Sequence, residues 1–159
     1  MYDVLIIGAG AAGYGCALTL ASNEKKDWAK DKKYLMIDDG DSDILKARFY
    51  NLAGVDFGIG GDELLSKMEN QIKNYKSCEL INDRVVKIEK IDDIFNISTL
   101  NGSFKTKIVV IATGMHKFDI ECDFTEILPH EDVLKPNLYY KSHNPTQCKT
   151  NKMRIPSYW

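Results

Sequence analysis

Three glycines close to the start of the chain have the spacing G-x-G-x-x-G, and they are Gly8, Gly10 and Gly13. An apolar strand is predicted just before them, over residues 4–7, and a helix of small residues just after them, over about residues 11–21. In such a unit the first glycine allows a tight turn, the second leaves room for a pyrophosphate, and the third lets the helix lie close to the sheet. The N–H groups at the helix start attract phosphates. The motif predicts a dinucleotide site; the alternative is a glycine-rich turn in a nucleotide-free α/β domain.

Two acidic residues, Asp38 and Asp39, follow the next predicted strand, which covers residues 34–37. A carboxylate at this point of a dinucleotide-binding unit accepts hydrogen bonds from the hydroxyls of an unphosphorylated ribose. Asp38 comes 25 residues after Gly13, slightly beyond the usual interval, because a charged run over residues 23–33 lengthens the connection. We expect Asp38, or else Asp39, to bind the ribose. The alternative is an acidic residue on a surface turn.

Length and composition limit the classes of function. The chain has 159 residues, enough for one domain with a hydrophobic core, and its net charge of −2 gives no general attraction to nucleic acids or acidic membranes. The first apolar stretch contains glycines and has no basic flank, so we expect neither a membrane span nor a signal peptide, and a cytoplasmic protein. No metal site and no redox dithiol are predicted, because the histidines are scattered and no two cysteines form C-x-x-C. The four cysteines are Cys16, Cys78, Cys122 and Cys148.

The middle of the chain predicts a helix over residues 62–75, with its apolar side in the core, and a short strand over residues 78–81. The glycines before that helix, Gly58, Gly60 and Gly61, are interpreted as loop residues.

Three further strands are predicted over residues 85–89, 95–100 and 103–111, and the turn dipeptides Asp92-Asp93 and Asn101-Gly102 separate them. The run of residues 108–112 is wholly apolar, which predicts a strand end that is buried on both faces. The predicted fold class is therefore α/β: a Rossmann-like parallel sheet with a three-stranded antiparallel β-meander, in three layers.

This order of elements resembles the FAD-binding domain of the thioredoxin reductase-like flavoproteins, within the pyridine nucleotide-disulfide oxidoreductases. The residues that carry the resemblance are the glycine motif, the acid at Asp38, the run Phe49-Tyr-Asn-Leu-Ala-Gly54, the run Ile59-Gly-Gly-Asp-Glu-Leu-Leu65 and the sequence Ile111-Ala-Thr-Gly114. The resemblance covers residues 2–114 and implies an FAD cofactor. It also implies that the following residues bind the cofactor, with Asp39 as the alternative to Asp38: Gly8, Gly10, Ala11, Ala12, Gly13, Asp38, Asn51, Val85, Ala112, Thr113 and Gly114.

The chain also departs from that family's pattern. It contains no second G-x-G-x-x-G/A for NADPH, no C-x-x-C, and no Gly-Asp pair after Gly114. Residues 115–159 hold all four prolines and show no clear periodicity, so we expect an irregular arm that packs on the FAD/dinucleotide-binding domain, residues 1–114, or on a partner subunit. No catalytic residue is identified.

Two functions remain open at this point. The first is a small redox flavoprotein that passes electrons from NAD(P)H or a protein donor to an acceptor. The second is a non-catalytic FAD- or nucleotide-binding subunit or sensor. A third interpretation, an NAD-binding domain without flavin, conflicts with the meander, because simple NAD domains have a helical crossover there. We also expect a homodimer and no nucleic acid or membrane partner.

Overall fold

The computed structural model describes residues 1–114 of the chain, so the predicted C-terminal arm lies outside the described residues. A six-stranded sheet in the order β5-β2-β1-β8-β7-β6 forms the centre of the described part, and a two-stranded hairpin lies apart from it. The strands of the large sheet are β1 (Tyr2–Ile7), β2 (Tyr34–Asp38), β5 (Cys78–Asn82), β6 (Val85–Ile91), β7 (Ile94–Thr99) and β8 (Ser103–Ile111). The other elements are α1 (Ala11–Ala21), the 3-10 helix η1 (Asp43–Lys46), β3 (Arg48–Phe49), β4 (Ile59–Gly60) and α2 (Gly61–Ile72). The predicted α/β, Rossmann-like class is confirmed.

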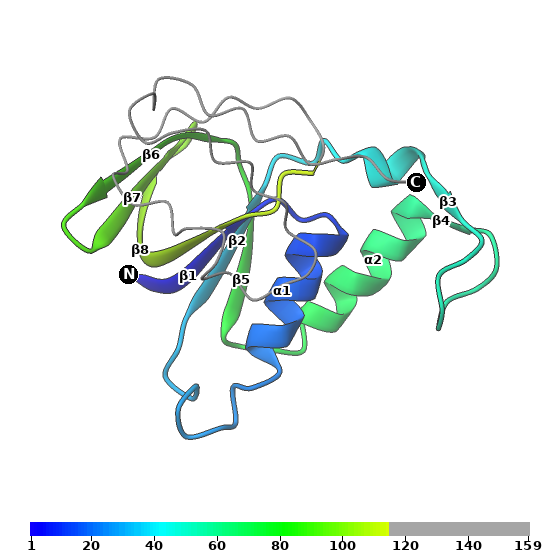
Figure 1. Ribbon diagram of the computed structural model, residues 1–159, viewed down its shortest axis with the longest axis horizontal. Coiled ribbons are helices and arrows are strands. Elements are labelled where there is room, and N and C mark those ends of the chain that lie inside the picture. The colour runs from blue at the N-terminus through cyan, green and yellow to red at the C-terminus, as the bar shows by residue number, and fades with distance from the viewer. Residues whose placement is uncertain (115–159) are drawn as a thin grey trace, which may run out of the picture. The chain divides into compact units, whose positions relative to one another are not determined.

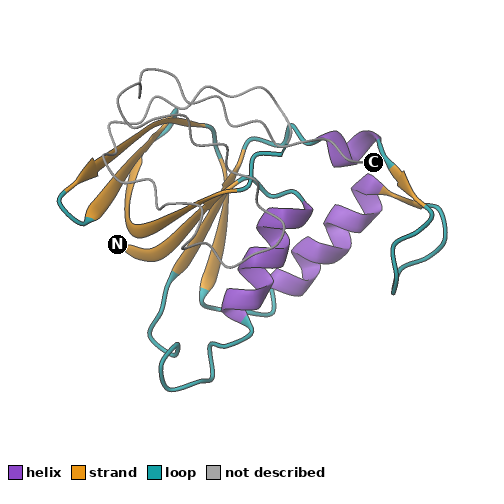
Figure 2. Ribbon diagram, viewed as in Figure 1, coloured by secondary structure: helices purple, strands orange, loops and turns teal. Residues whose placement is uncertain are grey.

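The long strand β8 belongs to both parts of the sheet. Its first residues, 103–106, pair antiparallel with β7, while residues 106–111 pair parallel with β1. The strands β6 and β7 therefore extend the sheet on one side and cover one face of its parallel part, and α1 and α2 cover the other face (Figures 1 and 2). The result is the three-layer arrangement that the sequence predicts.

Two apolar clusters hold these layers together, one on each face of the parallel strands. The cluster under the helices contains the buried residues Val4, Ile6, Ala17, Tyr34 and Met36, among others. The cluster under the meander consists of Leu5, Leu35, Ile37 and Ile97, each no more than 1 % exposed. Successive residues of β1 and β2 thus alternate between the two clusters, as strands buried on both faces must.

The end of β8 differs from the prediction of burial on both faces. Ile108 is 53 % exposed and Ile111 is 44 % exposed, so that prediction is wrong for this strand. The reason is that β7 pairs with β8 only as far as Thr106. Beyond that residue, β1 is the one described strand that pairs with β8.

Helix α2 begins against η1, and Gly61 makes this contact possible. A Cβ on Gly61 would lie 2.5 Å from the carbonyl carbon of Ile44 and would overlap its oxygen. The interpretation of Gly61 as a loop residue is therefore wrong, because it is the first residue of α2 and is fixed by close packing. The predicted apolar side of α2 is confirmed by the burial of Leu64 and Ile72.

Asp3, close to the start of β1, joins three segments at the amino-terminal edge of the sheet. Its Oδ1 accepts hydrogen bonds from Lys107 Nζ at 2.8 Å and Lys32 Nζ at 3.1 Å, and its Oδ2 accepts one from the N–H of Lys33 at 3.1 Å. Burial by itself would raise the pKa of Asp3, but the hydrogen bonds from Lys107, Lys33 and Lys32 outweigh it and lower the pKa to about 2. Asp3 therefore remains charged across the physiological range.

None of the helices within residues 1–114 is long and apolar enough to cross a membrane.

Candidate functional site

In the glycine turn between β1 and α1, two of the three glycines are required because a side chain there would clash with the protein's own backbone. Gly8 has φ +102°, and a Cβ there would lie 2.8 Å from the carbonyl carbon of Ala112. A Cβ on Gly13 would lie 2.9 Å from the carbonyl carbon of Gly8. Both distances are shorter than ordinary van der Waals contact, so both positions exclude a side chain.

Gly10 is different, because no atom of residues 1–114 requires a glycine there. The atoms nearest to a Cβ on Gly10 would be Ile44 Cδ1 at 3.7 Å and Ser42 Oγ at 3.9 Å, and its φ of −76° suits any residue. A backbone that remains open at this position fits a ligand group that approaches it closely.

The start of α1 next to Gly10 leaves its N–H groups available. Within the described part of the chain no side chain caps the helix, and no acidic residue lies in its first turn, while Ala11 and Ala12 are exposed. The N–H of Tyr14 donates to Gly10 O at 3.0 Å, so the N–H groups before Tyr14 precede the regular hydrogen-bonding pattern of the helix. Together with the helix dipole, this start suits an anionic group such as a pyrophosphate.

Backbone hydrogen bonds bring the carboxyl ends of the parallel strands together at the glycine turn. The N–H of Gly8 donates to Ile37 O, and the N–H of Ala112 donates to Ile7 O, both at 2.8 Å. The N–H of Asp83 donates to Asp38 O at 2.9 Å. The loops that follow β1, β2, β5 and β8 thus meet at one edge, which is where α/β sheets of this kind bind ligands.

The two acids predicted to bind a ribose have different surroundings. Asp38 accepts hydrogen bonds from the backbone, with Oδ1 bound to the N–H of Ala9 at 2.7 Å and Oδ2 bound to the N–H of Gly40 at 3.0 Å. Asp38 therefore joins the glycine turn to the loop after β2, although a carboxylate can accept further hydrogen bonds. Asp39 instead lines a cavity and pairs with Arg84, its Oδ2 lying 2.8 Å from Arg84 Nε.

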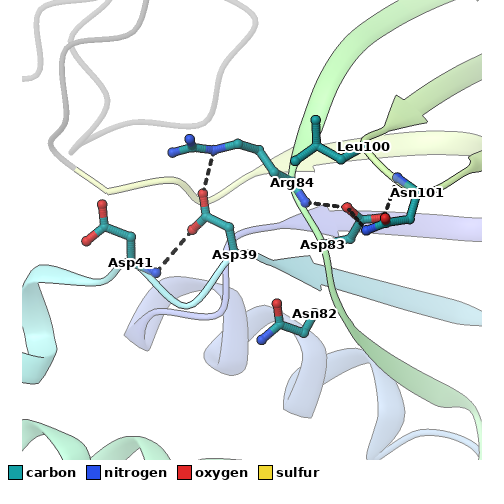
Figure 3. A pocket seen from close by; sticks show the side chains of 7 residues that line it. All are labelled: Asp39, Asp41, Asn82, Asp83, Arg84, Leu100 and Asn101. Carbon is teal, nitrogen blue, oxygen red and sulfur yellow. Dashed lines mark hydrogen bonds and ion pairs between the residues drawn. The ribbon is translucent and has the colours of Figure 1, made fainter.

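That cavity has a volume of about 420 Å³ and lies beside the carboxyl ends of β2 and β5 (Figure 3). Its lining is mostly polar and consists of Asp39, Asp41, Asn82, Asp83, Arg84, Leu100 and Asn101. Figure 3 shows the Arg84 side chain extending to the carboxylate of Asp39, while Asp83 and Asn101 point toward each other.

Asp83 holds the β7–β8 turn against the end of β5. Its Oδ1 accepts hydrogen bonds from the N–H of Arg84 at 2.7 Å and from Asn101 Nδ2 at 3.0 Å, and its Oδ2 accepts from the N–H of Asn101 at 3.3 Å. A hydrogen bond from Thr99 is the largest cause that lowers the pKa of Asp83; burial opposes it, and the other hydrogen bonds add to it. Asp83 is therefore held as a charged carboxylate, and its hydrogen bonds fix one wall of the cavity.

The turn that Asp83 holds is the Asn101-Gly102 turn predicted from the sequence. It contains three residues, 100–102, and neither Asn101 nor Gly102 has a positive φ, so it is not the two-residue turn that this dipeptide favours. Thr99 closes the turn through the backbone, its N–H donating to Gly102 O at 2.8 Å, and its Oγ1 accepts from the N–H of Gly102 at 3.0 Å. The Asp83 carboxylate accepts from the N–H of Asn101 in the same turn.

The remaining predicted site residues are distributed unevenly. Val85 begins β6 directly after the cavity residue Arg84, and Thr113 and Gly114 continue from β8 past Ala112, which touches the glycine turn. Asn51 is exposed on the loop of the β3–β4 hairpin and has no hydrogen-bond partner among residues 1–114. The carboxyl edge thus brings together the predicted residues of the glycine turn, the β2 acids, Val85 and the end of β8.

Of the seven residues that line the cavity, only Asp39 was among the predicted site residues, and the missed ones include Asn82, Arg84 and Asn101. A signal for the first two was present, because polar residues follow directly after the predicted strand 78–81 and ligands bind at the carboxyl ends of such strands. For Asn101 the sequence offered only a turn signal, and its position beside β5 depends on how β8 pairs with β1.

The two cysteines within residues 1–114, Cys16 and Cys78, are free thiols. Burial raises the pKa of Cys16 and raises that of Cys78 to about 11, with Glu79 and Cys16 adding to the second shift. Both thiols are therefore protonated at neutral pH, whereas thiol–disulfide exchange needs a thiolate.

The fold that positions these residues agrees with what comparison with known proteins finds. The chain matches the pyridine nucleotide-disulphide oxidoreductase family over residues 2–136. The thioredoxin reductase of Treponema pallidum (strain Nichols) is 30 % identical over 118 residues, which cover 71 % of this chain and 35 % of that protein. The ferredoxin–NADP reductase of Streptococcus sanguinis (strain SK36) is 26 % identical over 160 residues, which cover 98 % of this chain and 47 % of that protein.

Solved structures show the same similarity. Lactococcus lactis thioredoxin reductase has a TM-score of 0.63 at 32 % identity, covering 74 % of this chain and 37 % of that chain. The atypical thioredoxin reductase from Desulfovibrio vulgaris Hildenborough has a TM-score of 0.63 at 25 % identity, covering 74 % and 38 %. The chain spans about a third of the length of the curated thioredoxin reductases that it matches.

Proposed function

The chain belongs to the pyridine nucleotide-disulphide oxidoreductase family, and on this basis we propose that it is an FAD-holding redox protein that passes electrons between a donor in solution and an acceptor. FAD is the cofactor of this family. The observation that carries the proposal is Gly10, whose backbone remains open between the start of α1 and η1 although the packing of residues 1–114 does not require a glycine there.

The proposed site follows from the contacts at the carboxyl edge. Gly8, Gly10 and Gly13, with the N–H groups of Ala11 and Ala12, hold the pyrophosphate. Asp38 or Asp39 holds the adenosine ribose, and Val85 contacts the adenine. Beside the glycine turn the chain runs close to the cofactor at Ala112, Thr113 and Gly114, and Asn51 lies near the flavin. Bound FAD supplies two-electron redox chemistry, and these residues bind and orient it.

A second candidate is a non-catalytic FAD- or nucleotide-binding subunit or sensor. It is favoured by Cys16 and Cys78, whose thiols burial keeps protonated at neutral pH and therefore unsuited to thiol–disulfide exchange. A donor such as NAD(P)H or a protein, a homodimeric state and a cytoplasmic location complete the proposal for the redox protein. The two free thiols are in keeping with a reducing compartment.

The test begins with the full chain, purified and passed through a gel-filtration column with added FAD. We expect flavin absorbance to elute with the protein. NADH or NADPH is then added without oxygen, and it bleaches that absorbance if the chain is a redox protein. If no nicotinamide or thiol donor reduces the bound flavin, the result favours the binding subunit. A protein that elutes without flavin contradicts both.

Gly10→Val locates the site, and Gly15→Val is its matched control. We expect the side chain of Gly10→Val to occupy the pyrophosphate position and abolish flavin retention. A Cβ on Gly15 would have no atom of residues 1–114 within 4 Å, so that variant tests the same substitution on the same helix. Equal retention by the two variants would place the cofactor elsewhere.

A further inference from the structure

The lysine-rich loop between α1 and β2, residues 22–33, places a tryptophan among lysines. Trp28 is 64 % exposed. The lysines that lie within five residues of it in the sequence are Lys25, Lys26, Lys30, Lys32 and Lys33. One exposed apolar side chain is ordinary on a protein surface, so the exposure of Trp28 alone indicates nothing. It is the surrounding lysines and the shape of the loop that distinguish this tryptophan.

The protein holds the loop backbone on both sides of Trp28. Lys26 O accepts hydrogen bonds from the N–H groups of Ala29 and Lys30, both at 2.9 Å, which closes a turn around the tryptophan. The side chain of Ala29 is fully buried. Before the turn, Glu24 Oε2 accepts hydrogen bonds at 3.0 Å and 3.2 Å from two backbone N–H groups of the α2–β5 connection. The indole of Trp28 is therefore exposed on a turn that is fixed at both ends.

Most of the lysines near Trp28 have no acidic partner in the described part of the chain. Lys32 pairs with Asp3 at 3.1 Å, and Glu24 is occupied by backbone N–H groups. Within residues 1–114, the unpaired cations of the loop and of the α2–β5 connection are Lys25, Lys26, Lys30, Lys33 and Lys76, and the unpaired carboxylates are Asp27 and Asp31. This end of the sheet therefore has an excess of positive charge.

The opposite end of the sheet carries the opposite charge. The carboxyl edge holds Asp38, Asp39, Asp41 and Asp83, whereas the lysine-rich loop lies at the other end of α1 from the glycine turn (Figure 1). The expectation that the protein has no membrane partner rested on the chain's net charge of −2, which averages over these two ends. The lysine-rich loop by itself attracts anions.

We propose that the lysine-rich loop binds a bilayer surface that contains anionic lipids, with Trp28 in the headgroup layer and the lysines on the lipid phosphates. An indole suits this layer because its ring is apolar and its N–H is polar. Lysine stems lie along apolar material while their ammonium groups reach the phosphates. Protein interfaces are enriched in tryptophan but depleted in lysine, so this composition favours a lipid surface over an acidic protein. Contact through this end leaves the glycine turn, at the carboxyl edge, accessible from solution.

The chain allows a direct test, because it has two tryptophans and the second, Trp159, can be replaced. In the full chain with Trp159→Phe, the fluorescence of Trp28 is followed while phosphatidylcholine vesicles are added, either with or without phosphatidylglycerol. We expect the emission to move to shorter wavelength, and acrylamide to quench it less, with the anionic vesicles only. Sedimentation of the vesicles with the unsubstituted chain measures binding, which added salt should weaken because it screens exposed charges.

Two double variants that remove the same charge separate the loop from the rest of the surface. Lys26→Gln/Lys30→Gln removes two lysines of the loop. Lys46→Gln/Lys87→Gln removes two exposed lysines elsewhere and is the matched control. We expect the first to weaken binding to anionic vesicles roughly 25-fold, because each lysine near an anionic surface contributes about a factor of five, and the control to stay within about twofold of the parent. Trp28→Ala should weaken binding without changing its dependence on salt.

Binding that is absent, equal with and without phosphatidylglycerol, or reduced equally by the two double variants overturns the inference. So does a Trp28 emission spectrum that the anionic vesicles leave unchanged. If the chain ignores vesicles but single-stranded DNA or polyglutamate shifts the Trp28 emission, the loop binds a nucleic acid or an acidic protein, and the membrane inference is wrong. None of these outcomes depends on FAD, so the proposed function stands or falls separately.

Discussion

The carboxylate of Asp3 offers a test of stability that is independent of any cofactor. Asp3→Asn removes the charge that Lys32 and Lys107 share at the amino-terminal edge of the sheet. The pKa of Asp3 is about 2 in the folded protein against an ordinary value of 3.8, and each unit corresponds to about 1.4 kcal/mol, so the shift amounts to about 2.4 kcal/mol at most. Because the two lysine side chains are 42 % and 49 % exposed, solvent screens part of this, and we expect a loss of about 1–2 kcal/mol at pH 7.

The dependence on pH has a definite sign. A carboxyl whose folded pKa lies below its unfolded pKa stabilises the fold fully above the unfolded value, and this contribution is lost as the pH falls through the folded value. The difference in unfolding free energy between the parent and Asp3→Asn should therefore be constant from pH 7 to about pH 5. It should shrink between pH 4 and pH 2.

Urea denaturation followed by circular dichroism at several pH values measures this difference, and at pH 7 the thermal midpoint should fall by roughly 2–8 °C. Asp31→Asn is the control, because Asp31 is exposed in the same region and has no hydrogen-bond partner among residues 1–114. Equal stability of Asp3→Asn and the parent at pH 7, or a difference that persists unchanged at low pH, would refute the reasoning.

Two further predictions concern packing and the cavity wall. Gly61→Ala should destabilise the fold by about 1–3 kcal/mol, because its Cβ would meet the Ile44 carbonyl. Gly15→Ala, in the open position on α1, should instead stabilise the fold by roughly 0.5–1 kcal/mol. Chemical denaturation of both variants checks this, and a loss of stability at Gly15 as large as at Gly61 would contradict it. Asp83→Asn should weaken the hydrogen bonds to the β7–β8 turn and lower the protection of the Asn101 amide in hydrogen exchange, while unchanged protection would mean that the turn holds itself.

Much of the parallel framework could be predicted from the sequence. The apolar runs that became β1 and β2 lie between clear turn residues, and the small residues after Gly10 left little alternative to a close-packed helix. These signals are local, since each depends on residues within one or two turns of each other. The boundaries of β1, α1 and β2 accordingly agree with the prediction to within two residues.

The signals that failed depend on neighbours that are distant in the sequence. The apolar end of β8 predicted two buried faces, but whether Ile108 and Ile111 are covered depends on where β7 stops pairing. Gly61 looked like a loop residue because the Ile44 carbonyl that it accommodates comes from a separate element. Arg84 gave no local sign of its partner, because Asp39 comes from another strand end.

The end of β8 has a consequence for how the protein associates. Beyond Thr106 the backbone groups of β8 that point away from β1 form an open edge, with no other strand of residues 1–114 paired to it. An open edge can template a further strand, and natural proteins usually protect such edges with charges, bulges or a covering segment. Here the edge carries exposed isoleucines at positions 108 and 111. A further strand that pairs with this edge would therefore satisfy its free backbone groups and cover apolar surface at these two isoleucines.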